Sequence, residues 1–418
     1  MRKNYDIVII GGGPAGLAAA VSAFDNGIKD ILILEREPRT GGILNQCIHN
    51  GFGLARFKES LAGPEYAARF SVEVEKRNIE TLLETTVLSI SKDKEITAIN
   101  RENGVFTVSA KAIILAMGCR ERSRGALNIA GSRPSGVFSA GTAQKYVNVK
   151  GYMPGKEVVI LGSGDIGLIM ARRMTLEGAK VHAVCEIMPY SSGLKRNIVQ
   201  CLDDFGIPLY LNHTITEIRG DKRVTGVTIS QVDQNKKPIK GTEKSFDCDT
   251  VLFSVGLIPE NELTKGMGVE LSPRTKGAVV NQNRQTSIEG VFACGNALQV
   301  HDLVDFVSEE SELAGKSAAE YVKNGANQAD LFNCVNGKNI NYVLPQKIDK
   351  NISGDVKLFF RVSNTFKNCT IKLECDGEVL IKRVKRVATP GEMETLLLKE
   401  EIIKNAKGDV VLSLEENV

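Results

Sequence analysis

The chain has 418 residues, of which 42% are hydrophobic and 25% charged, and its net charge at pH 7 is +3. This length allows two or three domains with ample apolar material for cores, and the near-neutral balance argues against a nucleic-acid partner. Nine irregularly spaced cysteines without a CxxC pair argue against a disulfide framework or a structural zinc site and suit a reducing cytoplasm. No apolar run reaches the roughly 20 residues of a membrane helix, and we expect neither a signal peptide nor an integral membrane segment.

The first predicted element is an aliphatic strand that leads directly into a glycine-rich turn. Residues 7–10 read Ile-Val-Ile-Ile, residues 11–16 read Gly-Gly-Gly-Pro-Ala-Gly, and small residues then open a helix. A second aliphatic run at 31–34 ends in Glu35, 24 residues after the first glycine. This order of strand, GxGxxG turn, helix, strand and acid is the dinucleotide-binding fingerprint.

Each residue type in the fingerprint has a physical role. Gly11 permits the tight turn, Gly13 lets the backbone approach a pyrophosphate, and Gly16 lets the helix pack closely on the strand. The N-terminus of the helix offers free N–H groups and a positive dipole end to the phosphates. Glu35 is placed to hydrogen-bond the ribose hydroxyls.

The same pattern returns 151 residues later, with aliphatic residues at 158–161, the turn Gly162-Ser163-Gly164-Asp165-Ile166-Gly167, and an acid at Glu186. The first glycines and the acids of the two copies have the same 151-residue offset. Two copies in one register predict two Rossmann-type folds, each with its own dinucleotide.

Glu186 predicts the choice between the nicotinamide cofactors. A carboxylate at this position repels a 2′-phosphate, and NADP sites usually place an arginine nearby. No basic residue follows Glu186 until Lys195. We therefore expect NADH rather than NADPH.

Three further sequence motifs accompany the two glycine turns along the chain. An aliphatic strand at 112–118 ends in small residues, a strand at 249–259 carries the pattern GxxP, and residues 286–296 end in Gly295-Asn296. With the two glycine turns, these marks resemble the pyridine nucleotide–disulfide oxidoreductases, which are flavoproteins with two dinucleotide-binding domains. The resemblance covers about residues 5–325.

The resemblance implies an α/β fold with two Rossmann-like three-layer domains and a hydride that passes from NADH to FAD and onward to a second acceptor. FAD belongs to residues 1–120 and 250–330, and NADH to an inserted domain at 121–249. The expected cofactor contacts are Gly11, Gly13, Pro14, Ala15, Gly16, Glu35, Arg36, Gly42, Ala116, Gly118, Gly256, Gly295, Asn296 and Val304 for FAD, and Gly162, Gly164, Asp165, Ile166, Gly167 and Glu186 for NADH.

The chain departs from the family pattern at two places. Asn296 stands where the family has an aspartate that contacts the FAD ribityl chain; an amide can still hydrogen-bond the ribityl hydroxyls. Disulfide reductases carry CxxxxC after the first acid, but only Cys47 is present here. A dithiol relay needs two thiols, so disulfide reductase activity is disfavoured.

Cys47 and His49 are the candidate catalytic residues near the flavin. Cys47 is either a thiolate or sulfenate next to the isoalloxazine or an inert buried thiol. His49 is either a proton donor or a structural histidine.

A helix is expected over residues 305–322, with its N-terminus at the flavin pyrimidine edge. His301 and Asp302 either line the site or cap this helix. Arg120, Arg122 and Arg124 belong either to a solvated linker or to a phosphate site.

Residues 335–418 predict a small β domain, with strands at 356–362, 369–375, 379–387 and 410–414. Its expected role is docking or oligomerisation. The basic run at 382–386 alternates with apolar residues, as the exposed face of a strand does.

Residues 41–53, 118–122 and 300–305 resemble a subgroup that accompanies glycerol-3-phosphate dehydrogenase-like flavoproteins, a lineage that includes subunits of amino-acid and opine dehydrogenase complexes. This resemblance implies a partner subunit. Two alternatives to a self-sufficient NADH oxidoreductase therefore remain: an electron-relaying subunit of such a complex, and a flavin-bearing scaffold without catalysis.

Overall fold

The computed structural model describes residues 3–326 and 329–417, which divide into two compact units. The first unit contains the described residues up to Cys119 and from Pro259 onward, and the second is Arg120–Ile258. Residues 250–258, predicted to lie in the first unit, belong to the second, because β18 (Thr250–Phe253) pairs in parallel with β12 (Glu157–Leu161).

The first unit is built on a sheet of seven strands in the order β5-β2-β1-β8-β7-β6, with β20 also paired to β8. Strands β5, β2, β1, β8 and β20 pair in parallel, whereas β7 pairs antiparallel with both β8 and β6. Their bounds are β1 (Asn4–Ile10), β2 (Ile31–Leu34), β5 (Glu80–Leu82), β6 (Thr86–Ile90), β7 (Glu95–Asn100), β8 (Gly104–Leu115) and β20 (Val291–Ala293).

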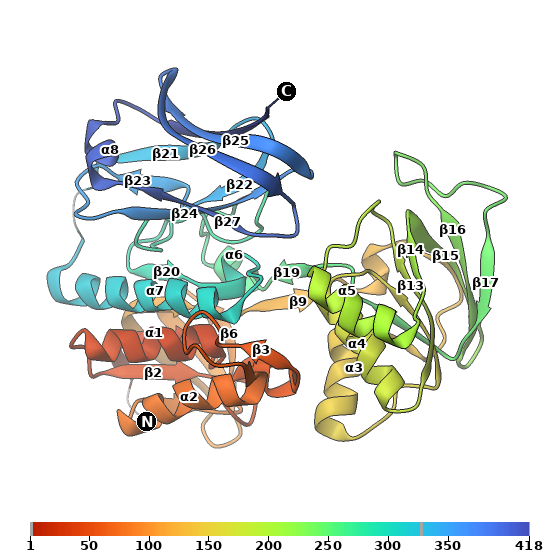
Figure 1. The fold of residues 1–418 in the computed structure, drawn as a ribbon. Helices are drawn as coiled ribbons and strands as arrows, with labels where there is room; N and C mark the ends of the chain where they lie inside the picture. The colour runs from red at the N-terminus through yellow and green to blue at the C-terminus, as the bar shows by residue number, and fades with distance from the viewer. Residues whose placement is uncertain (1–2, 327–328, 418) are drawn as a thin grey trace. The chain divides into compact units, whose positions relative to one another are not determined.

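Three helices cover one face of this sheet: α1 (Pro14–Asp25), α2 (Gly63–Lys76) and α7 (Val304–Asn324). Ile7 and Ile9 of β1 are buried in the core beneath these helices, whereas Val8 and Ile10 belong to a second core on the other face. Burial on both faces explains why residues 7–10 of this central strand are all apolar. Helices α1 and α7 lie side by side (Figure 1), and a Cβ atom at Gly315 would collide with the carbonyl oxygen of Ala19.

The second unit has three layers. A parallel sheet in the order β11-β18-β12-β13-β14 lies between helices on one face and a four-stranded sheet on the other. The remaining bounds are β11 (Val137–Ser139), β13 (Lys180–Glu186), β14 (Leu209–Leu211), α3 (Ala140–Lys145), α4 (Asp165–Leu176) and α5 (Lys195–Cys201), with β10 (Ala130–Gly131), β15 (His213–Gly220), β16 (Val224–Gln231) and β17 (Lys244–Asp247) in the third layer. The predicted α/β class with Rossmann-like folds is confirmed.

The C-terminal strands form two small sheets around their own apolar core, within the first unit (Figure 1, blue). One sheet has the order β23-β21-β28-β25-β26 and the other β22-β24-β27. The elements are β21 (Leu331–Asn336), β22 (Ile340–Leu344), β23 (Lys347–Asp349), β24 (Val356–Val362), β25 (Phe366–Cys375), β26 (Glu378–Ala388), β27 (Glu394–Leu398), α8 (Glu400–Asn405) and β28 (Val410–Glu416). The four strands expected here are present, and three of them are longer than predicted.

Short elements complete the chain: η1 (Gly42–Gln46), β3 (Asn50–Phe52), β4 (Leu61–Ala62), β9 (Cys119–Glu121), η2 (Arg124–Ala126), η3 (Tyr146–Lys150), η4 (Asp203–Phe205), β19 (Leu257–Pro259), α6 (Glu262–Gly266) and η5 (Gly295–Ala297). Of the helices in the described ranges, none has both the length and the apolar character that a membrane crossing requires.

Candidate functional site

The first glycine turn joins β1 to α1 and needs its glycines for steric reasons. Gly11 has φ +107°, and a Cβ atom there would lie 2.5 Å from the carbonyl oxygen of Ala116. A Cβ atom at Gly16 would collide with the carbonyl oxygen of Gly11. At Gly13, by contrast, the only atom within 4 Å of such a Cβ would be Cα of Gly42, at 3.8 Å. The turn is therefore tightly packed on its protein side and open where a phosphate would approach.

Segments far apart in the sequence meet at this turn. A Cβ atom at Gly42 would lie 3.0 Å from Cα of Gly13, and one at Gly295 would lie 2.7 Å from Cβ of Ala15. Gly42 and Gly295 both have positive φ angles, +55° and +64°. The structure thus brings together four of the expected FAD contacts, and the need for close approach explains their small size.

Glu35, at the end of β2, reaches back to the turn. Its Oε2 accepts a hydrogen bond from the backbone N–H of Gly12 at 2.6 Å, and its Oε1 accepts one from the N–H of Glu37 at 2.8 Å. Only 6% of Glu35 is exposed. The carboxylate is held beside the glycine turn, where a ribose would need it.

These features fit the adenine dinucleotide half of FAD. The N-cap of α1 is Gly13, and no described side chain caps the N-terminus of this helix. The free N–H groups, the open face of Gly13 and the adjacent carboxylate form the arrangement that binds a dinucleotide pyrophosphate and ribose.

The second glycine turn, between β12 and α4, repeats this construction. Gly162 has φ +100°, and a Cβ atom there would collide with the carbonyl oxygen of Ser254, the residue that follows β18. A Cβ atom at Gly167 would collide with the carbonyl oxygen of Gly162, whereas at Gly164 the nearest atoms would be hydroxyl oxygens of Ser254 and Ser192 at 3.6 and 3.7 Å. Ser254 occupies the place in the second unit that Ala116 has in the first.

Glu186 repeats both backbone hydrogen bonds of Glu35 and adds one from a side chain. Its Oε2 accepts from the backbone N–H of Ser163 at 3.0 Å and from the Ser163 hydroxyl at 2.6 Å. Its Oε1 accepts from the N–H of Met188 at 3.0 Å. Both carboxylates therefore bind the residue after the first glycine and the residue two positions beyond themselves.

Asp165 ties a following loop to the second turn. Its Oδ1 accepts from the N–H of Leu194 at 2.8 Å and from Nδ2 of Asn197 at 2.7 Å. The N–H of Gly193 also donates to the carbonyl oxygen of Ser163 at 3.0 Å. Sequence reasoning named Asp165 as a cofactor contact; the structure gives it a role in positioning residues 193–197 beside the turn.

Cys47 directly follows η1, and its local contacts favour the neutral thiol. Its Sγ donates a hydrogen bond to the carbonyl oxygen of Ile43 at 3.4 Å. Burial raises the pKa of the Cys47 thiol to about 12. A thiolate would need a nearby positive charge to offset this burial. The choice between a reactive and an inert Cys47 stays a prediction.

His49 lies two residues further along, with its ring centroid 4.9 Å from that of Phe52 and its Nδ1 3.3 Å from the carbonyl oxygen of Asn50. These are local contacts, and a catalytic role for His49 remains a prediction.

Asp305 anchors the loop that follows His49 to the start of α7. Its two carboxylate oxygens accept from the N–H of Gly53 at 3.2 Å and the N–H of Arg56 at 2.7 Å. The Arg56 guanidinium forms two hydrogen bonds with the carboxylate of Glu312, further along α7. Sequence reasoning had not assigned a function to these carboxylates, because their partners lie about 250 residues away in the chain.

Glu310 is the centre of a buried polar cluster in the first unit. It accepts hydrogen bonds from Nε of Arg284 at 3.2 Å, the N–H of Gly295 at 3.1 Å, Nε2 of Gln299 at 3.0 Å and Nε2 of His301 at 2.9 Å. Burial opposes ionisation of Glu310, but the charges and hydrogen bonds of these partners outweigh it and hold its pKa below the usual value.

The structure shows which partners His301 and Asp302 have. His301 is buried against Glu310, while Asp302 pairs with Arg361 of β24 and accepts from the N–H of Met393 at 2.7 Å. Neither caps α7, since this helix has no side-chain cap among the described residues. The capping interpretation is wrong, because both side chains have stronger partners elsewhere.

Asn296 uses both ends of its amide inside the first unit. Its Oδ1 accepts from the N–H of His301 at 3.0 Å, and its Nδ2 lies 3.5 Å from Sγ of Cys119. Val304 is the first residue of α7 and therefore has an N–H without an intrahelical partner. The ribityl contact of Asn296 and the flavin contact of Val304 remain predictions.

The remaining expected cofactor contacts lie at exposed, open or helix-start positions. Arg36 is exposed, and Gly118 and Gly256 have φ values of +74° and +102° with nothing near a Cβ position. Pro14 and Ile166 lie in the first turns of α1 and α4.

Of the three arginines that follow Cys119, Arg124 donates to the carbonyl oxygen of Ser132 at 2.6 Å. The choice between a solvated linker and a phosphate site for Arg120, Arg122 and Arg124 stays a prediction.

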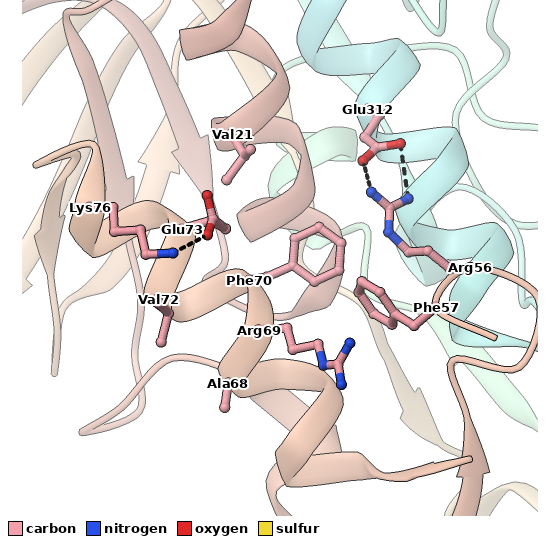
Figure 2. A pocket seen from close by; sticks show the side chains of 10 residues that line it. All are labelled: Val21, Arg56, Phe57, Ala68, Arg69, Phe70, Val72, Glu73, Lys76 and Glu312. Atoms are coloured by element: carbon pink, nitrogen blue, oxygen red, sulfur yellow. Dashed lines mark hydrogen bonds and ion pairs between the residues drawn. The ribbon is translucent and has the colours of Figure 1, made fainter. Parts of the chain in front are cut away.

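A cavity of about 500 Å³ lies between α1, α2, α7 and the loop that contains Arg56 (Figure 2). Figure 2 shows Phe57 and Phe70 at its centre, with Arg56 paired to Glu312 and Lys76 paired to Glu73. None of the predicted site residues lines it. Because these cations are already paired, we assign no chemistry to this cavity.

Known proteins provide an independent comparison. The chain is 24% identical over 336 residues to an opine oxidase subunit of Agrobacterium tumefaciens (strain Ach5), a match that covers 75% of this chain and 64% of that protein. It is 28% identical over 306 residues to an alkyl hydroperoxide reductase subunit of Pseudomonas aeruginosa, which covers 72% and 54%. It is also 27% identical over 322 residues to thioredoxin reductase of Mycolicibacterium smegmatis, which covers 75% and 93%. The chain thus spans less than two thirds of the first two relatives.

Solved structures agree with the fold. Thioredoxin reductase of T. acidophilum superposes with a TM-score of 0.63 at 28% identity, over 76% of this chain and 99% of that one. An NAD-dependent persulfide reductase from A. fulgidus reaches a TM-score of 0.58 at 18% identity over 89% of this chain and 68% of that one, which shows a shared fold only. A family model described as pyridine nucleotide-disulphide oxidoreductase matches residues 5–329. Since this match spans well over half of the chain and both glycine turns, the chain belongs to the pyridine nucleotide-disulphide oxidoreductase family.

Proposed function

We propose that the chain is an FAD-dependent NADH:acceptor oxidoreductase, which takes a hydride from NADH and passes the electrons to a second acceptor. The observation that carries this proposal is that Glu35 and Glu186 accept the same two backbone hydrogen bonds beside two glycine turns of the same construction. One glycine turn with its carboxylate would indicate a single bound dinucleotide, whereas two indicate a pair of dinucleotides that exchange electrons. When bound, FAD would supply the hydride acceptor.

The chain's own residues bind and orient the two nucleotides. In the first unit, the free N–H groups at the start of α1 bind the pyrophosphate, and Glu35 binds a ribose. In the second unit, the start of α4 and Glu186 do the same, while Asp165 holds residues 193–197 close to the turn. Catalysis then depends on positioning, because the redox chemistry belongs to the cofactors.

The preference for NADH rests on Glu186. Its carboxylate is 6% exposed and held by three hydrogen bonds, so it has a fixed position beside the turn. A 2′-phosphate at the ribose would meet this negative charge, and the next residues offer no cation to offset it.

The second acceptor is not a disulfide reduced through a dithiol relay. Cys47 is the one cysteine in the segment where the disulfide reductases carry two, and burial raises its pKa to about 12. Such a thiol is a poor nucleophile at neutral pH. Small-molecule or protein acceptors that take electrons without thiol exchange fit this site better.

Anaerobic titration of the purified, FAD-loaded chain with NADH tests the proposal. We expect stoichiometric loss of the oxidised flavin absorbance with NADH and a much lower kcat/KM with NADPH. A chain that binds no FAD, or whose flavin absorbance NADH leaves unchanged, would contradict the proposal. A preference for NADPH would contradict only the assignment of Glu186.

A second candidate is an electron-transfer component of a larger dehydrogenase complex, either glycerol-3-phosphate dehydrogenase-like or specific for an amino acid. The similarity to a protein named as an opine oxidase subunit favours it, as does a C-terminal domain outside the family match. Assays of the chain with NADH and an artificial dye separate the two candidates. High turnover of the chain alone supports the first, and turnover only after addition of a partner protein supports the second.

A further inference from the structure

Strand β26 leaves one edge of the larger C-terminal sheet open. It is the last strand in the order β23-β21-β28-β25-β26, and among the described residues only β25 pairs with it. It has 11 residues, about twice the usual length of a strand. An open edge of this length presents a row of unpaired N–H and C=O groups that another strand can join. This part of the chain lies beyond residue 329, where the family match ends.

The basic side chains on one face of β26 are paired with a carboxylate, whereas among the described residues those on the other face are not. On the face toward the smaller sheet, Arg383 and Lys385 both pair with Glu394 of β27. On the other face, Lys382, Val384 and Arg386 alternate with them and are exposed, Val384 to 67%. Neither Lys382 nor Arg386 has an ion pair or hydrogen bond within the described part of the chain. The open face therefore presents an apolar side chain between two exposed cations.

A second copy of this chain is a poor occupant of that edge. If two β26 strands paired antiparallel about Val384, Lys382 of each would lie opposite Arg386 of the other. Like charges directly opposite each other destabilise a strand pair. A register centred on Leu380 would instead set Glu378 opposite Lys382, but it would pair only residues 378–382 of the 11-residue strand and leave Val384 and Arg386 uncovered.

We propose that the open edge of β26 binds an extended acidic segment of a partner protein by strand addition. The backbone of that segment continues the sheet, and the side chains on the face it shares with Lys382, Val384 and Arg386, which occur at every second residue, are acidic, apolar and acidic in turn. Its acids then lie opposite Lys382 and Arg386, and an apolar side chain covers Val384, as favourable cross-strand pairs require. This inference concerns a docking surface and does not depend on the proposed redox activity.

The test uses the FAD-loaded chain and a short labelled peptide with the central sequence Glu-Thr-Val-Thr-Glu, which places two glutamates and the valine between them on one face of a strand. Fluorescence anisotropy measures binding. We expect saturable binding, and at least about tenfold weaker binding by the Lys382→Glu/Arg386→Glu variant. The same variant should bind a matching peptide with lysine in place of each glutamate, which the original chain should not bind.

Two controls separate strand addition from attraction to any anion. The variant Lys265→Glu/Lys407→Glu makes the same change in net charge at two exposed lysines that have no ion pair within the described residues, and it should bind as the original chain does. A Glu-Thr-Val-Thr-Glu peptide with alternate backbone amides methylated keeps its charge but cannot pair on one edge, and it should not bind. Thermal unfolding midpoints of both variants establish that they are folded.

Hydrogen exchange identifies the site directly. Addition of the peptide should slow the exchange of backbone amides within Glu378–Ala388 and leave those of α7 unchanged. The proposal is overturned if the peptide fails to bind or if β26 gains no protection. It is also overturned if heparin or an oligonucleotide binds as well as the peptide with the same charge dependence, which would indicate a polyanion site. Self-association that Lys382→Glu/Arg386→Glu abolishes would show that a second copy is the occupant.

Discussion

The imidazole Nε2 of His301 lies 2.9 Å from Oε2 of Glu310, and neither side chain has any exposed surface. Glu310 belongs to α7, whereas His301 belongs to the loop between η5 and that helix. The same carboxylate binds the backbone of Gly295 and the guanidinium of Arg284. The buried carboxylate of Glu310 therefore holds in place the segment that follows Gly295-Asn296, the last of the family motifs.

Removal of Glu310 should destabilise the first unit strongly. In the Glu310→Ala variant, Arg284 keeps its charge in a site where only 3% of its side chain is exposed. Breaking a buried pair in this way costs about 3 kcal/mol. Urea unfolding followed by circular dichroism measures the loss. Glu309→Ala, which removes a half-exposed partner of Lys357, is the matched control and should cost at most about 1 kcal/mol. Equal effects of the two substitutions would contradict the importance of the buried cluster.

The same cluster predicts a dependence on pH. The pKa of Glu310 lies below its usual value of 4.5, because its buried partners favour the charged form despite the cost of burial. A group whose pKa is lowered by folding contributes stability above its unfolded pKa, and this contribution is lost as the pH falls through the folded pKa. The difference in unfolding free energy between the original chain and Glu310→Gln should therefore shrink as the pH falls below about 4.5. A free-energy difference that grows as the pH falls would contradict this prediction.

Conservative substitution of the two paired carboxylates should separate the two nucleotides. Glu35→Gln should weaken FAD binding, and Glu186→Gln should raise KM for NADH, each by about tenfold, since an amide cannot accept all the hydrogen bonds that each carboxylate takes. FAD retention on gel filtration and steady-state kinetics measure the two effects. Each variant is the control for the other. Loss of FAD from Glu186→Gln would show that the assignment of the two turns is reversed.

Cys47 should behave as an unreactive thiol. Because burial raises its pKa to about 12, its thiolate fraction near neutral pH is smaller than that of a free thiol by on the order of a thousandfold. Alkylation by iodoacetamide at pH 8, followed by mass spectrometry, should therefore be slow at Cys47. Cys47→Ser should leave NADH turnover and the visible spectrum of the bound flavin unchanged. A long-wavelength absorbance band that disappears in Cys47→Ser would instead reveal a thiolate beside the flavin.

Asp305→Ala should release the loop that contains Gly53 and Arg56. The substitution leaves two backbone N–H groups without their acceptor, which removes about 2 kcal/mol from the free energy that holds the loop on α7. Faster hydrogen exchange in residues 53–57, without a comparable change in the second unit, is the expected result. Asp93→Ala, in an exposed turn, should have no such effect. If exchange in the loop stays slow, Arg56 and Glu312 alone hold it.

Local chemistry in the sequence was enough to find both glycine turns. The glycines at 11, 13 and 16, and again at 162, 164 and 167, are required by backbone geometry over a few residues, so their pattern is visible without the fold. Glu35 and Glu186 were predicted from their spacing for the same reason. The C-terminal strands followed from the alternation of apolar and polar residues, which also depends only on neighbours in the chain.

Other features depended on contacts that no local pattern contains. Sequence placed the return to the first unit at residue 250, but the pairing of β18 with β12 moved it to Pro259, because a strand belongs to the sheet it joins and not to the segment it follows. The burial of Glu310 among four donors, the anchoring of Gly53 by Asp305 and the open edge of β26 likewise arise from residues brought together by folding. The sequence alone determined where the two glycine turns and their carboxylates lie, since that is short-range geometry. Only the tertiary structure decided which charges are buried, paired or left open, since these depend on partners far away in the chain.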